Sequence, residues 1–173
     1  MPNDVYTAAL EKITQNTLQI RDLIEAAGKL TATGQTGFAR QLYQTWIGSN
    51  ANDPQLYVAL FNCSALEGQL GDAGAAIESL KRAIALNPDF MPAYINLGGF
   101  MERSGGSAQA IALWRTAVAR PVAVDGSAVS YTVTALKQIA RVFCDHQQPE
   151  NAEGPIRHCI DIDPHQRDII EQY

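Results

Sequence analysis

The sequence predicts an all-α protein, a right-handed superhelix of about four helix-turn-helix repeats preceded by an N-terminal helix. One observation behind this prediction is a period of 34 residues, at which residue types recur between neighbouring stretches. Another is that small residues return at fixed offsets, as stacked hairpins require where two helices approach closely. A third is that prolines stand near the expected repeat ends, where they stop a helix. The recurring pairs are Asn62 and Asn96, Gly71 and Gly105, Ala76 and Ala110, Leu80 and Trp114, and Ala83 and Ala117.

The N-terminal segment, residues 1–18, should form a helix that caps the array or mediates oligomerisation. Val5, Ala9 and Ile13 share one helical face, and Asn3 or Asp4 can cap the helix start. No helix breaker separates this segment from Arg21, so a continuous run into the first repeat helix is an alternative.

The array should occupy residues 19–164, with repeats at about 19–53, 54–88, 89–122 and 126–164. The middle two repeats fit best, with turns at Gly71-Asp72 and Gly105-Gly106. In the first repeat the offset is 37 residues, because the run GSNAND lengthens the exit loop, and Trp46 replaces the usual small residue. Packing at Trp46 should therefore differ from packing in the other repeats.

The last repeat should follow a linker, VAVDGSAVS, and its turn should have a different geometry because Gln147 stands at the turn glycine position with Pro149 after it. Residues 165–173 read as the start of a further helix, so the chain resembles a piece of a longer protein. The close-approach positions are Ala27, Ser64, Gly98 and Ala140, with Ala39, Ala76, Ala110 and Ala152 at a second site, and the prolines at repeat ends are Pro54, Pro88, Pro121 and Pro164.

Composition narrows the partners that the chain is expected to have. Its 173 residues carry a formal net charge of −5 and no Lys/Arg run, so nucleic acid is not an expected partner. No segment approaches the roughly 18 apolar residues of a membrane span, and MPNDVYTAALEK lacks the regions of a signal peptide. We therefore expect a soluble, cytoplasmic chain. Three cysteines without CxxC spacing argue against a disulfide framework; Cys63 and Cys159 should be buried.

The repeat pattern resembles the tetratricopeptide repeat over roughly residues 20–164. Three runs, FARQLYQTWIGSNANDP, ALFNCSALEGQLGDAGAAIESLKRAIALNPDFMPAYINLGGFMERSGGSAQAIALWR and IDIDPHQRDIIEQY, are similar to the repeat region of bacterial SPINDLY-type O-linked N-acetylglucosamine transferases. The resemblance implies that these repeats recognise an acceptor protein and that a sugar-nucleotide-binding domain of two Rossmann-like halves follows them. It also implies a ladder of asparagines on the concave surface, of which Asn62 and Asn96 would be two rungs.

The first helices of stacked hairpins line a concave groove that suits extended peptides. One offset on this wall is polar in every repeat, and such side chains can hydrogen-bond a peptide backbone or simply face water. Arg103, Lys137 and Arg141 would form a cationic patch, unless Glu102 and Asp145 balance them. Ile24, Gly28 and Pro92 stand where a chaperone-type carboxylate clamp needs polar residues, which weakens that interpretation. The predicted groove residues are Glu25, Asn62, Asn96, Gln138, Phe61, Ile95, Gln69, Arg103, Lys137 and Arg141.

No catalytic residue, metal site or cofactor is predicted. Asp161 and Asp163 imitate a metal-binding DxD motif but fall at an expected helix end. Cys144, His146, His158 and Cys159 lack the spacing of a zinc site. The sequence thus favours a non-catalytic module that binds protein or peptide, either the acceptor-recognition region of a glycosyltransferase or a stand-alone scaffold, with a homo-oligomer as a further option. An enzyme complete within the chain is the least favoured hypothesis.

Overall fold

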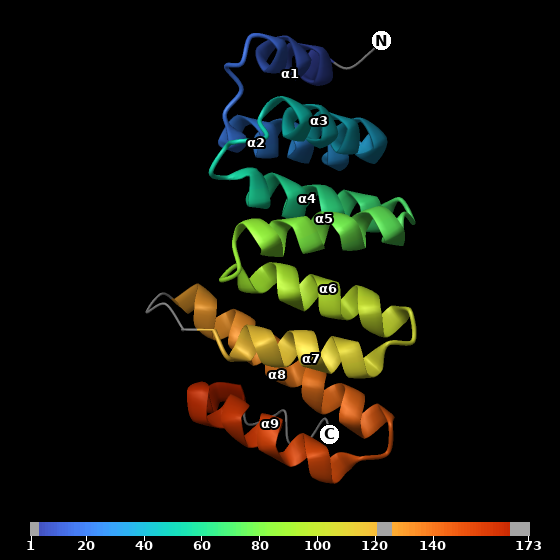
Figure 1. Ribbon diagram of the computed structural model, residues 1–173, viewed down its shortest axis with the longest axis vertical. Helices are drawn as coiled ribbons and strands as arrows, with labels where there is room; N and C mark the ends of the chain where they lie inside the picture. The colour runs from blue at the N-terminus through green and yellow to red at the C-terminus, as the bar shows by residue number, and fades with distance from the viewer. Residues whose placement is uncertain (1–3, 121–125, 167–173) are drawn as a thin grey trace. The chain divides into compact units, whose positions relative to one another are not determined.

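The computed structural model describes residues 4–120 and 126–166, and these residues are helical except for short connections (Figure 1). They contain nine α-helices and one short 3₁₀ helix and no strand. The predicted all-α class is confirmed, and each predicted repeat interval contains two helices. The helices are α1 (Asp4–Thr14), α2 (Ile20–Ala32), α3 (Thr36–Ser49), α4 (Leu56–Gln69), α5 (Ala73–Leu86), α6 (Met91–Arg103), α7 (Ser107–Val118), α8 (Gly126–Asp145) and α9 (Pro149–Ile162), followed by the 3₁₀ helix Pro164–Gln166.

The chain divides into two compact units, unit 1 (Met1–Asn87) and unit 2 (Pro88–Tyr173). Unit 1 contains α1 and the hairpins α2–α3 and α4–α5, and unit 2 contains the hairpins α6–α7 and α8–α9. The predicted close-approach positions are buried in both units, and the alanines among them are at most 3% exposed. These alanines lie in the packed interior because only a short side chain fits between two closely spaced helices.

The N-terminal helix is separate from the first repeat helix, so the alternative of a continuous run is wrong. Helix α1 ends at Thr14, and Asn16 adopts a left-handed conformation with φ 55°. The Thr17 amide then donates to the Lys12 carbonyl at 2.9 Å, the six-to-one bond that closes a Schellman cap. Helix α1 packs on α2 and α3, and it buries Ala9 and Ile13 against them. Its apolar face is therefore used within unit 1.

The same cap ends the first helix of every hairpin. Gly34, Gly71 and Gly105 have φ between 76° and 84°, a conformation that a side chain disfavours. Gln147 adopts it as well, with φ 58°, and the Gln148 amide donates to the Phe143 carbonyl at 2.8 Å. The prediction of a different fourth turn is thus wrong. The turn has the same backbone geometry as the other three, and Gln147 adopts a left-handed conformation that is unfavourable for a residue with a side chain.

Each unit buries one tryptophan on the second helix of a hairpin, at different positions of the repeat. In unit 1, Trp46 is 1% exposed and its indole donates to the Leu18 carbonyl at 2.9 Å. In unit 2, Trp114 is 1% exposed and donates to the Ile95 carbonyl at 3.1 Å. Trp46 stands where the other repeats have a small residue, and the sequence predicts that packing differs there. The structure confirms the difference, because the Trp46 indole is hydrogen-bonded to Leu18 in the segment before α2.

The last hairpin begins where the fourth repeat is predicted to begin, but within the segment that is predicted to be a linker. Helix α8 starts at Gly126, so the final five residues of the predicted linker are helical. The earlier part of the linker, with Pro121, and the expected further helix after residue 166 lie outside the described residues. Within the described ranges, no helix is long and apolar enough to cross a bilayer.

Candidate functional site

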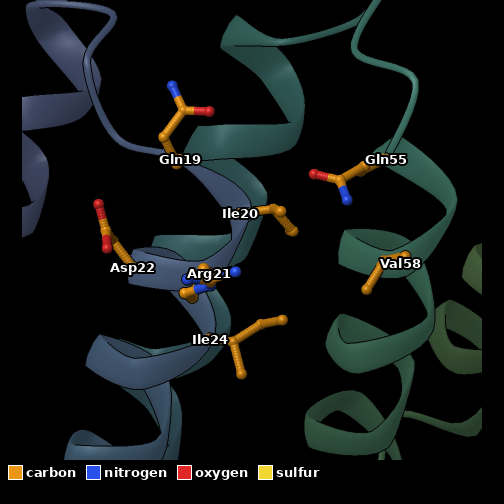
Figure 2. A pocket seen from close by; sticks show the side chains of 7 residues that line it. All are labelled: Gln19, Ile20, Arg21, Asp22, Ile24, Gln55 and Val58. Carbon is orange, nitrogen blue, oxygen red and sulfur yellow. The ribbon is translucent and has the colours of Figure 1, made fainter.

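Unit 1 has a groove between α2 and α4. One half of it is a cavity of about 570 Å³. Figure 2 shows Ile20 and Ile24 extending from α2, and Gln55 and Val58 from the α4 side, toward the space between the two helices. Asp22 extends from α2 on the side away from α4 (Figure 2). The lining residues of this half are Gln19, Ile20, Arg21, Asp22, Ile24, Gln55 and Val58.

The other half of the groove is a cavity of about 390 Å³ that also contacts α3. Ile24 lines both cavities, so the two follow one another along α2. We call the two together the unit 1 groove. The lining residues of this half are Ile24, Ala27, Gly28, Thr31 and Ala32 from α2, Tyr43 from α3, and Asn62, Ala65 and Leu66 from α4.

Helical spacing explains why these residues share the groove. Side chains four residues apart stack on one helix face, so Ile20, Ile24 and Gly28 form one row on α2. The core face of α2 is a different row, with Leu23 and Leu30 fully buried. In the groove row, Ile20 is buried at the start of the helix, whereas Ile24, one turn further on, is 42% exposed. A Cβ placed on Gly28 would meet no atom within 4 Å, so this wall has open space in front of it.

Two polar groups in the groove lack partners. The side chain of Asn62 is half-buried, and no hydrogen bond joins its amide to a described residue. Tyr43 is only 3% exposed, yet its ring lines the groove and its hydroxyl has no hydrogen-bond partner among the described residues. Burial raises the pKa of Tyr43 above its ordinary value, with a smaller contribution from Cys63, so the hydroxyl stays protonated and able to donate.

Beneath the groove, unit 1 contains a buried carboxylate that sequence reasoning missed. Glu67 is 3% exposed and accepts hydrogen bonds from the Ser79 hydroxyl at 2.8 Å and the Cys63 thiol at 3.4 Å. Burial, and then the Glu67 carboxylate, raise the pKa of Cys63 above its ordinary value, so this thiol is neutral. A glutamate in a helix usually faces water. The only sequence signal that Glu67 is buried is Cys63, a predicted core residue that lies four residues earlier on the same helix face.

Of the site residues predicted in unit 1, only Asn62 lines the groove. Glu25 lies on the side of α2 that faces α1, where it pairs with Lys29 at 2.6 Å. The hydrogen bond from Lys29, and its charge, hold the pKa of Glu25 below its usual range. Phe61 is half-buried and Gln69 is exposed, and neither lines the groove. Ile24 and Gly28, which in the sequence only argued against a carboxylate clamp, are groove residues.

In unit 2 two of the predicted polar residues, Gln138 and Arg141, contact each other. The Gln138 carbonyl oxygen accepts from Arg141 Nε at 3.1 Å and Nη2 at 3.0 Å. Arg141 also pairs with Glu102 at 2.6 Å and Asp145 at 2.8 Å, and the Glu102 hydrogen bond raises its pKa. The alternative that these two carboxylates balance Arg141 is therefore the observed arrangement.

The remaining predicted residues of unit 2 do not complete a cationic patch. Arg103 lies over the ring of Phe100 at 4.5 Å, and Lys137 is half-buried. Asn96 is half-buried, and like Asn62 its amide has no hydrogen-bond partner among the described residues. Beside it, the Ile95 carbonyl is already used by Trp114. Asn96 is thus the polar residue of this group that is left with an unpaired amide.

The motifs that suggested metal binding do not assemble. No group of three potential metal ligands occurs in the part of the chain that the structure describes. Cys159 is buried and His158 is exposed, as the sequence predicts for the two sides of α9. The Asp163 carboxylate accepts the His165 amide at 3.1 Å, so it takes part in the turn after α9.

No family model matches the chain, and no curated protein matches it. Among solved structures, the crystal structure of MamA is similar over 93% of this chain and 88% of its own length, with a TM-score of 0.70 and 16% identity. A tetratricopeptide repeat protein from Parabacteroides merdae ATCC 43184 matches with a TM-score of 0.70 and 16% identity over 83% of this chain and 53% of that one.

A third structure, a thermophilic TPR protein of Thermus thermophilus, covers 97% of this chain and 86% of its own, with a TM-score of 0.62 and 16% identity. None of these three is described as a glycosyltransferase, so the narrower resemblance rests on the sequence runs alone. At such low identity the matches concern the fold. The chain has the helix-hairpin fold of tetratricopeptide repeat proteins.

Proposed function

We propose that this chain is a non-catalytic interaction module that binds extended stretches of a partner polypeptide on the first helices of its repeats. The observation that carries the proposal is the unit 1 groove, in which apolar side chains surround the free amide of Asn62. A carboxamide can donate to a peptide carbonyl and accept from a peptide N–H, so it suits a backbone that every polypeptide has. The apolar walls supply affinity as they lose contact with water.

Unit 2 contributes a second binding surface in this proposal. Asn96 on α6 occupies the repeat position of Asn62 and has an equally free amide. The polar neighbours on α8 bind one another, so Asn96 is the group that remains for a peptide.

The test uses displayed random linear peptides selected on the intact chain, with one selected peptide then synthesised as a labelled probe. We expect Asn62→Ala and Asn96→Ala together to weaken binding about 25-fold, with about fivefold from the loss of one neutral hydrogen bond at each position. Helicity and the free energy of unfolding should stay nearly unchanged, because neither amide supports the fold. Gln41→Ala, which removes an exposed amide of α3, is the matched control. Selection that enriches no peptide would contradict the proposal.

A second candidate is the acceptor-recognition region of a protein O-glycosyltransferase. The two free amides at the asparagine ladder positions favour it over a general adaptor. It predicts a sugar-nucleotide-binding domain in the same reading frame and no binding of sugar nucleotide by these residues themselves. A reading frame that encodes no such domain would leave the stand-alone scaffold.

A further inference from the structure

The two halves of the unit 1 groove differ in charge. The half that contains Ile20 and Val58 also has Arg21 and Asp22 at its edge. The half that contains Gly28 and Asn62 is lined by no charged side chain. Lys29 and Glu25, the nearest ionised residues on α2, pair with each other on the side that faces α1. A charged ligand group would therefore meet no counter-charge in this second half.

The hydroxyl of Tyr43 is the second feature of this half. Tyr43 is only 3% exposed, but its hydroxyl oxygen is not among the fully buried side-chain atoms that lack a partner, so the hydroxyl is accessible from the groove, where water or a ligand can accept its hydrogen bond. Here the ring reaches the groove from α3 and the hydroxyl has no partner among the described residues. The Thr31 hydroxyl, by contrast, already donates to the Ala27 carbonyl at 2.9 Å. Tyr43 and Asn62 are thus two unpaired groups that line one apolar cavity.

We propose that this half is a neutral subsite for one peptide group and one uncharged apolar side chain of the extended partner. Asn62 pairs with the peptide N–H or C=O, Tyr43 donates to the carbonyl, and the apolar side chain occupies the open space in front of Gly28. This inference rests on the proposed function and specifies its ligand. An acidic or basic residue is rejected at this position, because burying a charge without a partner is unfavourable.

Gly28 provides a test that does not disturb the fold. A Cβ at this position meets nothing within 4 Å, and Gly28 is a helical residue that lines the cavity, so the side chain of Gly28→Leu extends into the subsite. Gly37→Leu on α3 is the matched control, since a Cβ there also meets nothing and Gly37 lines neither cavity. Both substitutions should leave the protein folded and at least as stable, because leucine favours helix more than glycine does.

The probe is the labelled peptide selected on the intact wild-type chain. We expect Gly28→Leu to weaken its binding at least about tenfold by steric exclusion, and Gly37→Leu to leave binding unchanged. Tyr43→Phe should weaken binding about fivefold, as the loss of one neutral hydrogen bond does, without lowering the midpoint of urea unfolding. Selected peptides should share an uncharged apolar position, and replacing that residue with Asp should abolish binding.

The outcomes separate the subsite from the proposed function. Peptides that bind wild type and Gly28→Leu equally, or that require an acidic residue, overturn the neutral subsite and leave polypeptide binding in place. Selection that enriches nothing overturns both. A Tyr43→Phe variant that loses stability but keeps its affinity would show that the hydroxyl serves the fold, and this also overturns the role given to Tyr43.

Discussion

The two units place glycines and amides on comparable first helices but use them differently. In α2 of unit 1, Gly28 faces open space, whereas in α6 of unit 2 a Cβ on Gly98 would lie 2.3 Å from the Trp114 indole nitrogen. In unit 1 the Asn62 amide is free, whereas in unit 2 the Gln138 amide is held by Arg141. Asn62 and Gln138 share a repeat position, and Gly28 lies one position after that of Gly98, so neither a shared nor an adjacent repeat position implies an equivalent role. Whether a groove residue can bind a partner depends on whether neighbouring side chains already occupy its hydrogen-bonding groups.

The largest expected effect concerns the two glycines. Gly98→Leu should destabilise the protein by about 3 kcal/mol, because the added side chain overlaps an indole that is buried and hydrogen-bonded to Ile95. Gly28→Leu should cost nothing. Urea unfolding followed by circular dichroism measures the stability of both variants. Equal unfolding midpoints for the two variants would contradict the claim that Gly98 is tightly packed while Gly28 faces open space.

The next effect concerns the thiol beneath the unit 1 groove. The pKa of Cys63 is raised in the folded chain. The neutral thiol therefore contributes its full share to the free energy of unfolding below its ordinary pKa of 9.0, and this share is lost as the pH rises above that value. The free energy of unfolding should fall by about 1.4 kcal/mol for each pH unit above about pH 9 on account of this thiol. Tyr43, whose pKa is also raised, adds a loss of the same sign above its ordinary value of 10.0.

Comparison with Cys63→Ala isolates this effect, because Cys159 in unit 2 also has a pKa raised by burial. Urea unfolding near pH 8 and pH 10 should show a shallower alkaline decline in the variant than in wild type. Parallel declines in the two proteins would mean that Cys63 ionises as easily in the folded chain as in the unfolded one.

The polar network of unit 2 should stabilise the fold rather than a ligand. Arg141→Met should lower the free energy of unfolding by about 1 kcal/mol, since the Arg141–Glu102 pair is partly shielded from water. Arg157→Met is the matched control: its pair with Glu153 is mostly exposed, and its loss should change stability by less than about 0.5 kcal/mol. If Arg141→Met weakens binding of the selected peptide while stability holds, the network belongs to the binding surface.

The smallest expected effect is a gain. Gln147→Gly should stabilise the chain by about 0.5 to 1 kcal/mol, because glycine adopts the left-handed turn conformation that glutamine disfavours. Gln148→Gly, one residue further on and outside the left-handed region, should stabilise nothing. Thermal unfolding of the two variants distinguishes the cap from a general effect of loop glycines.

The sequence predicts the hairpins well because periodic apolar and small residues report directly on helix packing. The sequence is less informative about helix ends, where backbone conformation and backbone hydrogen bonds determine the structure. Asn16 and Gln147 end helices in the same way as the turn glycines. Asparagine tolerates the left-handed conformation better than most residues, but glutamine does not, so the residue type gives no sign of the cap at Gln147. A cap depends on a pair of backbone hydrogen bonds, which side-chain patterns do not show.

The candidate site could be predicted only in part. Asn62 and Asn96 follow from the repeat offset, but the same offset also selects Glu25 and Gln138, which are bound to neighbouring side chains. Tyr43 fits the spacing of core residues, and it is indeed buried, so the repeat pattern gives no sign of a binding role. That its hydroxyl lacks a partner depends on atoms from three helices, and a single sequence does not contain that information.

The central claim is that the unit 1 groove binds an extended polypeptide through Asn62. The most direct measurement is calorimetric titration of a selected peptide into the wild-type chain and into Asn62→Ala. We expect the dissociation constant to rise about fivefold in the variant, with the free energy of unfolding unchanged. An unchanged dissociation constant would contradict the claim, and so would a variant that binds more weakly only because it has lost stability.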